Sequence, residues 1–154
     1  MAALLDKDSG GIAAGAYNAE WLPKAPGWVV VEHKFDATNP LNTSCVVFFK
    51  NPSSFLRVAD WWVMSEQLDS GAGLVLNIGL LNSTSNPTAL TTNWATSSTL
   101  GRNATASIER NPDGKCALPR NVSVLDIGVH FGTVAATPVQ SYKKMVMGVL
   151  FVPW

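Results

Sequence analysis

The sequence is poor in charge. Of its 154 residues, 11 are Lys or Arg and 11 are Asp or Glu, so the formal net charge is zero and charged residues make up 14% of the chain. Typical soluble domains carry roughly 25%. A protein that binds nucleic acid through its phosphates needs clustered basic side chains to displace counterions. The composition therefore excludes an electrostatic nucleic-acid binder.

Long hydrophobic runs are also missing. The apolar stretches at 46–49 and 145–152 are much shorter than the ~20 residues that a membrane-spanning helix needs. The first eleven residues, MAALLDKDSGG, lack the order of a charged segment followed by an apolar one that marks a secretory signal. We therefore expect neither a membrane partner nor export.

Metal-ligating patterns are absent, since there is no Cys-x-x-Cys and no His-x-x-x-His. The candidate carboxylates stand singly along the chain, at Asp60, Asp69, Asp113 and Asp126. We expect no metal site and no cofactor. The two cysteines, Cys45 and Cys116, favour reduced thiols, because Cys45 sits in the apolar run TSCVVFFK. A disulfide between them would be worth roughly 4 kcal/mol in the chain-entropy model and stays an alternative.

Catalytic signatures are equally scarce. His33 and His130 are the only histidines. A triad of Ser123, His130 and Asp126 can be composed on paper, but such a set has low specificity in a Ser-rich chain and no nucleophile elbow accompanies it. We expect no catalytic residues and no enzyme activity.

Hydrophobic residues, by contrast, make up 47% of the chain. With so few charges, either part of the apolar surface is covered by a partner, or Ser, Thr and Asn cover the outside of an independent domain. Both interpretations stay open on composition alone.

Period-two alternation is the main structural signal. In the segment 67–82, QLDSGAGLVLNIGLLN, alternate residues Leu74, Leu76, Ile78 and Leu80 fall on one face of a predicted strand. Similar patterns predict strands over 28–36, 43–50, 55–65, 105–110, 122–131 and 144–152. About seven or eight antiparallel strands result, which predicts an all-β fold: an antiparallel β-sandwich, jelly roll or barrel-like domain.

The connections carry their own signals. The small residues of 69–73 (DSGAG) predict a hairpin turn between the strands at 55–65 and 74–81, and 111–114 (NPDG) predicts a second hairpin. The segment 93–100 (NWATSSTL) predicts a short helix, closed by Gly101.

The first 26 residues differ from the rest, because they are rich in Gly, Ala and Pro and show no apolar periodicity. We interpret 1–26 as an extended N-terminal arm and 27–154 as a single β domain. The arm is either disordered or laid across a neighbouring surface, and its two large aromatics favour the second.

Aromatic residues supply the candidates for protein interaction, because large aromatics often anchor interfaces. These candidates are Tyr17, Trp21, Trp28, Trp62, Phe151 and Trp154. Trp61 and Trp62 must point to opposite faces of their strand, one toward the core and one outward. Exposed tryptophans also stack on sugars in carbohydrate-binding β-sandwiches, which is the alternative.

One pattern extends from Phe55 to the C-terminus. LDSGAGLVLNIGLLN is followed by ATSSTLGR, by VLDIGVHFGTVAATP and by a final apolar strand. This order resembles the capsid decoration proteins of tailed bacteriophages, also called cement or auxiliary head proteins. The resemblance implies a structural virion protein, made in the host cytoplasm, that binds the outside of an assembled capsid and clamps neighbouring subunits. It implies the major capsid protein as partner, a homo-oligomer, often a trimer, and no catalysis.

Two hypotheses accompany this resemblance. The arm is expected to reach over an adjacent subunit, with Tyr17 and Trp21 as anchors. The alternative function is a carbohydrate-binding or host-recognition β domain of a phage fibre or surface adhesin.

Overall fold

The computed structural model describes residues 12–18, 27–35, 45–50, 56–82, 90–111, 125–133, 135–139 and 142–153. This part of the chain contains nine strands and no helix. The strands are β1 (Ile12–Asn18), β2 (Gly27–Phe35), β3 (Cys45–Lys50), β4 (Leu56–Ser65), β5 (Val75–Asn82), β6 (Leu90–Ser98), β7 (Ser107–Arg110), β8 (Leu125–Thr133) and β9 (Lys143–Pro153). Within these ranges, no helix is long and apolar enough to cross a membrane.

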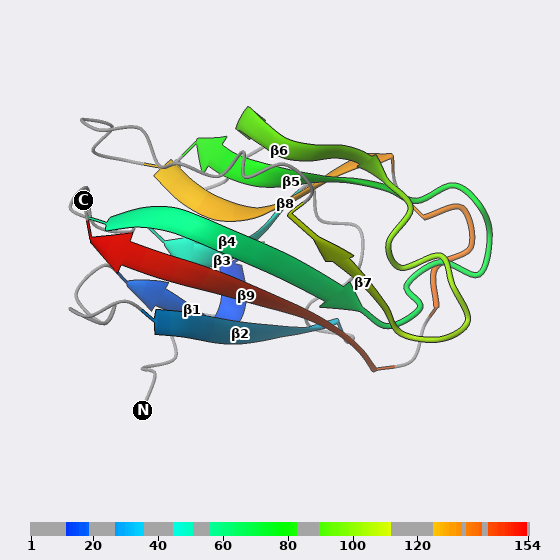
Figure 1. Ribbon diagram of the computed structural model, residues 1–154. Helices are drawn as coiled ribbons and strands as arrows, with labels where there is room; N and C mark the ends of the chain where they lie inside the picture. Colours follow the sequence, from blue (N-terminus) through cyan, green and yellow to red (C-terminus); the bar gives the residue numbers. More distant parts are fainter. Residues whose placement is uncertain are drawn as a thin grey trace.

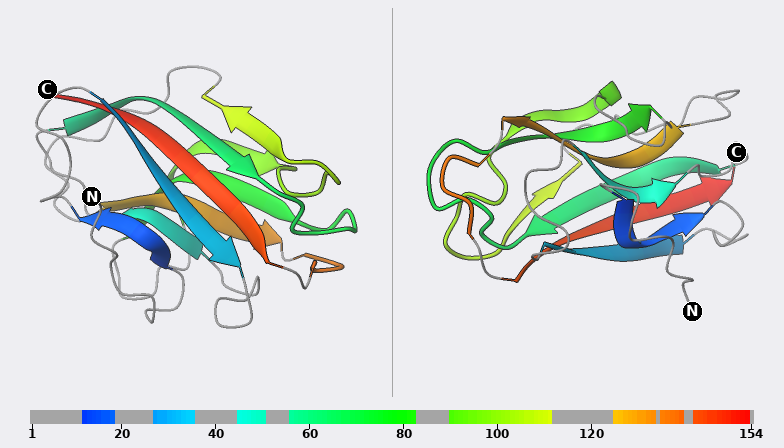
Figure 2. Two further views of the ribbon diagram at one scale, coloured as in Figure 1. Left: turned by 90° about the horizontal axis from the view of Figure 1, so that it is seen from below. Right: turned by 180° about the vertical axis from the view of Figure 1, so that it is seen from behind.

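The strands form two sheets that pack face to face (Figures 1 and 2). The five-stranded sheet has the order β1-β3-β8-β5-β6, and the four-stranded sheet has the order β2-β9-β4-β7. Antiparallel partners are nested as β2/β9, β3/β8, β4/β7 and β5/β6. This nesting is the jelly-roll arrangement. Of the alternatives that the sequence leaves open, the pairing selects the jelly-roll sandwich, with β1 added beside β3.

The sequence predicts the inward face of β2 and the burial of β3 correctly. In β2, every second residue from Val29 to Phe35 is buried and the intervening side chains are exposed or half-buried. β3 is buried along 45–49, as its apolar character on both faces predicts. β9, whose sequence is apolar on both faces, lies between β2 and β4 in the four-stranded sheet.

A bulge in β4 decides where its two tryptophans point. The pairing with β9 shifts register between Val58 and Asp60, so the alternation changes phase there. Trp61 then turns into the core, where it is 1% exposed and stacks on Trp94 at a ring distance of 6.1 Å. Trp62 turns to the outer face and is half-buried.

Among the described residues, three connections join the sheets at the end opposite the C-terminal end of β9 (Figure 1). They run from β4 to β5, from β6 to β7 and from β8 to β9. The predicted hairpin at 69–73 is therefore wrong, because β4 and β5 lie in different sheets. A hairpin between β7 and β8 is wrong for the same reason, while its turn at 112–114 lies outside the described residues.

The predicted helix over 93–100 is also wrong. Residues 90–98 form β6, which pairs with β5 through several register shifts. Those irregularities interrupt the period of two and leave Trp94 and Ser98 buried four residues apart, which imitates a helical face. Gly101 does adopt a left-handed conformation, with φ of 87°, but in the turn that follows β6.

Part of the predicted arm belongs to the sandwich. β1 pairs in parallel with β3 of its own chain and also contacts β2 of the other sheet. This is the one parallel pairing among the strands described, so the expectation of purely antiparallel strands is corrected. The division at residue 26 and the reach of the arm over a neighbour stay predictions.

Candidate functional site

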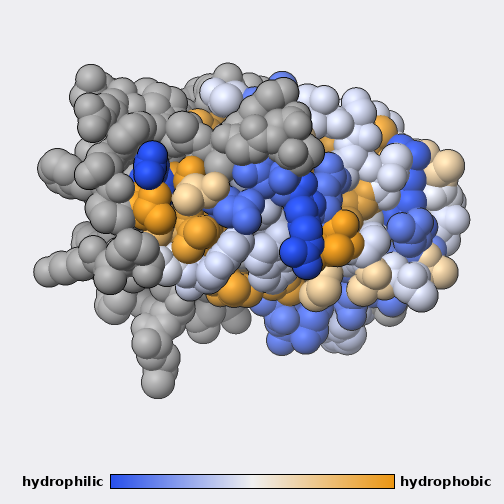
Figure 3. Space-filling view, viewed as in Figure 1, coloured by the Kyte–Doolittle hydropathy of each residue, from blue (hydrophilic) through white to orange (hydrophobic). Residues whose placement is uncertain are grey.

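The outer face of the four-stranded sheet carries several exposed apolar side chains. One cross-strand row runs through all four strands, as Val30, Gly148, Trp62 and Arg110. Val30 is 50% exposed, and Trp28 and Ile108, on the same sheet, are 47% and 48% exposed. Figure 3 views this face, where hydrophobic residues in orange alternate with hydrophilic ones in blue. We call this surface the β2-β9-β4-β7 face.

Trp62 lies flat across the middle of this face because the residue opposite it is a glycine. A Cβ atom at Gly148 would come within 2.3 Å of Cε2 and 2.4 Å of Nε1 of the Trp62 indole. The ring therefore occupies the space above the backbone of β9 that a side chain would fill. Packing of an aromatic ring over a strand glycine also fixes the ring orientation.

An open groove of about 390 Å³ lies beside this ring. It is lined by Trp28, Asp60, Trp61, Trp62, Ile108, Arg110 and Asn111. One carboxylate oxygen of Asp60 accepts the backbone N–H of Trp61 at 2.8 Å. The buried indole N–H of Trp61 has no hydrogen-bond acceptor among the described residues. The groove thus combines flat aromatic surface with charged and polar groups.

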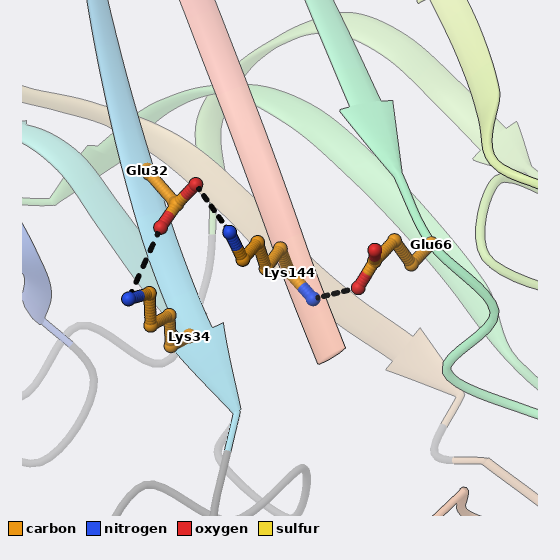
Figure 4. Close-up of polar contacts among 4 residues, drawn as sticks. All are labelled: Glu32, Lys34, Glu66 and Lys144. Atoms are coloured by element: carbon orange, nitrogen blue, oxygen red, sulfur yellow. Dashed lines mark hydrogen bonds and ion pairs between the residues drawn. The ribbon is translucent and has the colours of Figure 1, made fainter. Parts of the chain in front are cut away.

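The opposite end of the same face is charged (Figure 4). Glu32 lies between two lysines, with its carboxylate oxygens 3.6 Å from Lys34 Nζ and 3.3 Å from Lys144 Nζ. The backbone N–H of Lys144 donates to Glu66 Oε2 at 2.8 Å. These groups are exposed, and such pairs contribute little to stability.

A buried carboxylate ties the sheet connections together. Asp69 is fully buried, and its two oxygens accept five backbone N–H groups at 2.8 to 3.2 Å. Three of the donors, Gly71, Gly73 and Leu74, belong to its own connection, and the other two, Ala136 and Thr137, belong to the one between β8 and β9.

The connection from β6 to β7 is bound to the connection from β4 to β5 through backbone hydrogen bonds. The carbonyl oxygen of Gly101 accepts the N–H groups of Leu68 and Asp69 at 2.7 and 3.1 Å. The three sheet-to-sheet connections described at this end are therefore held at one point, around Asp69.

The electrostatics of Asp69 follow from these bonds. Burial alone raises the pKa of a carboxyl group, but the N–H donors of Thr137, Leu74, Gly71 and Ala136 favour the charged form. The net effect lowers the pKa of Asp69 from 3.8 to about 2. The carboxylate is charged in the folded protein at neutral pH, with a structural role.

The structure places the predicted interaction residues in different environments. Trp28 and Trp62 come together at the groove. The expectation that Phe151 anchors an interface is corrected, because its side chain is fully buried and packs on Phe49 at a ring distance of 5.4 Å. Phe151 points inward because it alternates in phase with Met145, Met147 and Val149. The side chain of Tyr17, and all of Trp21 and Trp154, lie outside the described residues.

The two histidines do not meet. His33 points into the core from β2 and contacts the ring of Phe35 at 4.6 Å. His130 lies on β8 in the other sheet, with its Nδ1 3.5 Å from Asn77 Nδ2. Asp126 sits four residues before His130 on the same strand, a separation of about 13 Å, too far for a hydrogen bond. Among the described residues, no three His, Cys, Asp or Glu side chains gather as metal ligands.

The cysteines are placed only in part. Cys45 is buried at the start of β3, as predicted, and Cys116 lies outside the described residues.

Several residues of the groove were not predicted from the sequence. Arg110 and Ile108 reach it because β7 pairs with β4. Asp60 shares the face of Trp62, two residues on, and the β4 bulge turns that face outward. Neither feature has a local sequence signature. For Asp69 a signal did exist, because Asp before a Gly-rich segment is typical of side-chain bonding to its own turn.

Comparisons with known proteins give a fold relationship. No protein-family model and no curated protein sequence matches the chain. Among solved structures, a chain of the cyanophage Pam1 capsid asymmetric unit aligns with a TM-score of 0.57 and 14% identity. A chain of the Ralstonia phage GP4 capsid aligns with a TM-score of 0.55 and 17% identity. Each alignment covers 86% of this chain and 89% of the other. At these identities, the likeness establishes a shared fold.

Proposed function

We propose that this chain is a structural virion protein that binds the outside of an assembled phage capsid and stabilises it by clamping neighbouring capsid subunits. The observation that carries the proposal is the fold match to chains of two phage capsids. The coverage of 89% means that each capsid chain is matched almost whole, as a separate subunit of similar size. The fold likeness therefore extends over most of this chain and most of each capsid chain.

The physical properties of the chain support the same role. A clamp needs a rigid scaffold, and three described connections at one end of the jelly roll are held together by Asp69 and Gly101. A lattice of identical subunits offers many copies of one site, so modest contacts add up through multivalency. Low charge and exposed apolar side chains such as Val30 suit contacts of this kind.

The role is proposed to be free of catalysis. On the described part of the chain, the histidines lie in different sheets and three potential metal ligands never gather. The partner proposed is the major capsid protein, and the protein is proposed to act as a homo-oligomer, a trimer in the form that the sequence resemblance implies.

Heating of virions prepared with and without this protein tests the proposal. A partner that binds only the assembled capsid must stabilise it. We expect particles that carry the protein to release their DNA, followed with an intercalating dye, at a higher temperature than particles that lack it. Adding purified protein back to deficient particles should restore the difference. Equal release temperatures, with the added protein failing to sediment with the particles, would refute the role.

A host-recognition β domain is the second candidate, favoured by the tryptophan-lined groove. Sedimentation of the same virion preparation distinguishes the two roles. A free-standing recognition domain would be found on a fibre or adhesin and would not sediment with DNA-filled heads.

A further inference from the structure

We propose that the groove beside Trp62 on the β2-β9-β4-β7 face is a carbohydrate-binding site, which takes a pyranose unit of a surface glycan. This inference goes beyond capsid attachment and does not depend on it. It starts from the indole of Trp62, which is held flat above Gly148. One face of the ring rests on β9, and the residue is half-buried, which leaves the other face toward solvent.

A flat, fixed indole matches the chemistry of a sugar ring. A pyranose has faces of C–H groups with a slight positive charge, and the face of an aromatic ring is negative. Because the ring cannot collapse onto β9 any further, little side-chain entropy is lost when a ligand stacks on it. Trp28 lines the same groove at 47% exposure and supplies a second apolar wall.

Polar groups surround the aromatic surface where sugar hydroxyls need partners. Asp60, Arg110 and Asn111 line the groove. Asp60 uses one oxygen for the N–H of Trp61, and neither Asp60 nor Arg110 belongs to an ion pair among the described residues. A carboxylate and a guanidinium can each hold two adjacent hydroxyls. Small-molecule sites share this combination of apolar walls and a few directed polar groups.

The same features argue against a protein partner at this spot. The core of a protein interface is depleted of Asp and Glu. Here the carboxylate of Asp60 lies beside the two tryptophans, within an open groove of about 390 Å³. That volume is at the lower end of the range for small-ligand sites.

The β4 bulge also fits a binding role. It turns Asp60 and Trp62 outward together and sends Trp61 into the core. Bulges often lie next to functional sites, where they redirect a side chain. Jelly rolls serve as lectin domains as well as capsid domains, so the fold accommodates both roles.

The test uses the full-length protein on an array of bacterial surface oligosaccharides, with the strongest hit titrated in solution. We expect the wild type to bind at least one array glycan and Trp62→Ala to weaken it at least tenfold. Gly148→Ala should also weaken it, because the new Cβ displaces the ring without removing it. Tyr142→Ala is the matched control, since Tyr142 is an aromatic residue at 81% exposure that does not line the groove.

Thermal melting of each variant separates lost binding from lost folding, and a folded Trp62→Phe variant should keep part of the affinity. Failure of the wild type to bind any array glycan would overturn the inference. So would a Trp62→Ala variant that binds glycan like the wild type, or one that loses only sedimentation with capsids. A negative array alongside normal capsid binding leaves the structural role standing, so the two proposals fail independently.

Discussion

The carboxylate of Asp69 accepts the backbone N–H of Thr137 at 2.8 Å, although 68 residues separate them in the chain. Asp69 lies in the connection from β4 to β5, and Thr137 lies in the connection from β8 to β9. Both connections cross between the sheets, so this bond fixes one crossing against another. Consecutive strands of a jelly roll mostly alternate between the two sheets. A contact between two connections therefore fixes the position of one sheet relative to the other at this end of the sandwich.

Replacement of Asp69 should destabilise the fold more than its single charge suggests. In Asp69→Asn, an amide with one oxygen faces five N–H donors, and buried donors lose their partners. We expect a loss of about 3 kcal/mol or more in the free energy of unfolding, measured with urea. Asp60→Asn is the control, because Asp60 accepts one local N–H, and it should cost less than about 1 kcal/mol. Equal losses in the two variants would contradict the account.

The lowered pKa of Asp69 predicts a specific acid sensitivity. A carboxyl whose pKa falls from 3.8 in the unfolded chain to about 2 in the folded protein stabilises the fold fully above pH 5. That stability, about 2 kcal/mol, disappears as the pH falls through the folded pKa.

The difference in the free energy of unfolding between wild type and Asp69→Asn isolates this effect. It should narrow by about 1 kcal/mol at pH 3 and by about 2 kcal/mol at pH 2, relative to pH 6. Urea unfolding across this range checks it, and a difference that stays constant with pH would show that Asp69 titrates normally.

Two glycines on β8 should respond differently to the same change. A Cβ at Gly128 would lie 2.1 Å from the backbone oxygen of Val46, whereas a Cβ at Gly132 would meet the side chain of Asn77 at 2.8 Å. Side chains move aside and paired strands do not. Gly128→Ala should therefore cost about 3 kcal/mol or prevent folding, and Gly132→Ala should cost less than about 1 kcal/mol. Urea midpoints and soluble yield give the comparison. A larger loss of stability in Gly132→Ala than in Gly128→Ala would contradict the pairing of β3 with β8.

The neighbouring tryptophans of β4 offer a test of the bulge. Trp61→Ala removes a buried ring stacked on Trp94 and should cost about 3–5 kcal/mol. Trp62→Ala removes a half-buried ring and should cost less than about 2 kcal/mol. Calorimetric melting of both variants measures the contrast, and a larger loss in Trp62→Ala would mean that the alternation in β4 has the opposite phase.

Strand positions and inward faces were predictable because period-two alternation is a local property of the chain. Val29, Val31 and Phe35 could be assigned to the core from their spacing, and so could Leu74 to Leu80. The same parity marks Phe151 as a core residue, although its aromatic character led to its choice as an interface anchor.

Connections and pairings were less predictable, since they depend on residues far apart in the chain. The segment 69–73 has the composition of a hairpin turn, but its Asp is held by N–H groups of residues 136 and 137, which no local pattern encodes. The groove depends on β7 pairing with β4, so Arg110 could not be placed beside Trp62. Period-two spacing does put Asp60 on the same face as Trp62, but the β4 bulge decides that this face is the outer one.

Location in the virion is the most direct test of the central claim. Cryo-electron microscopy of virions with and without this protein should show jelly-roll density on the outer capsid surface, in contact with neighbouring capsid subunits, only in particles that contain it. Identical capsid maps from the two preparations, or density for the protein only in the tail, would contradict a capsid-clamping role.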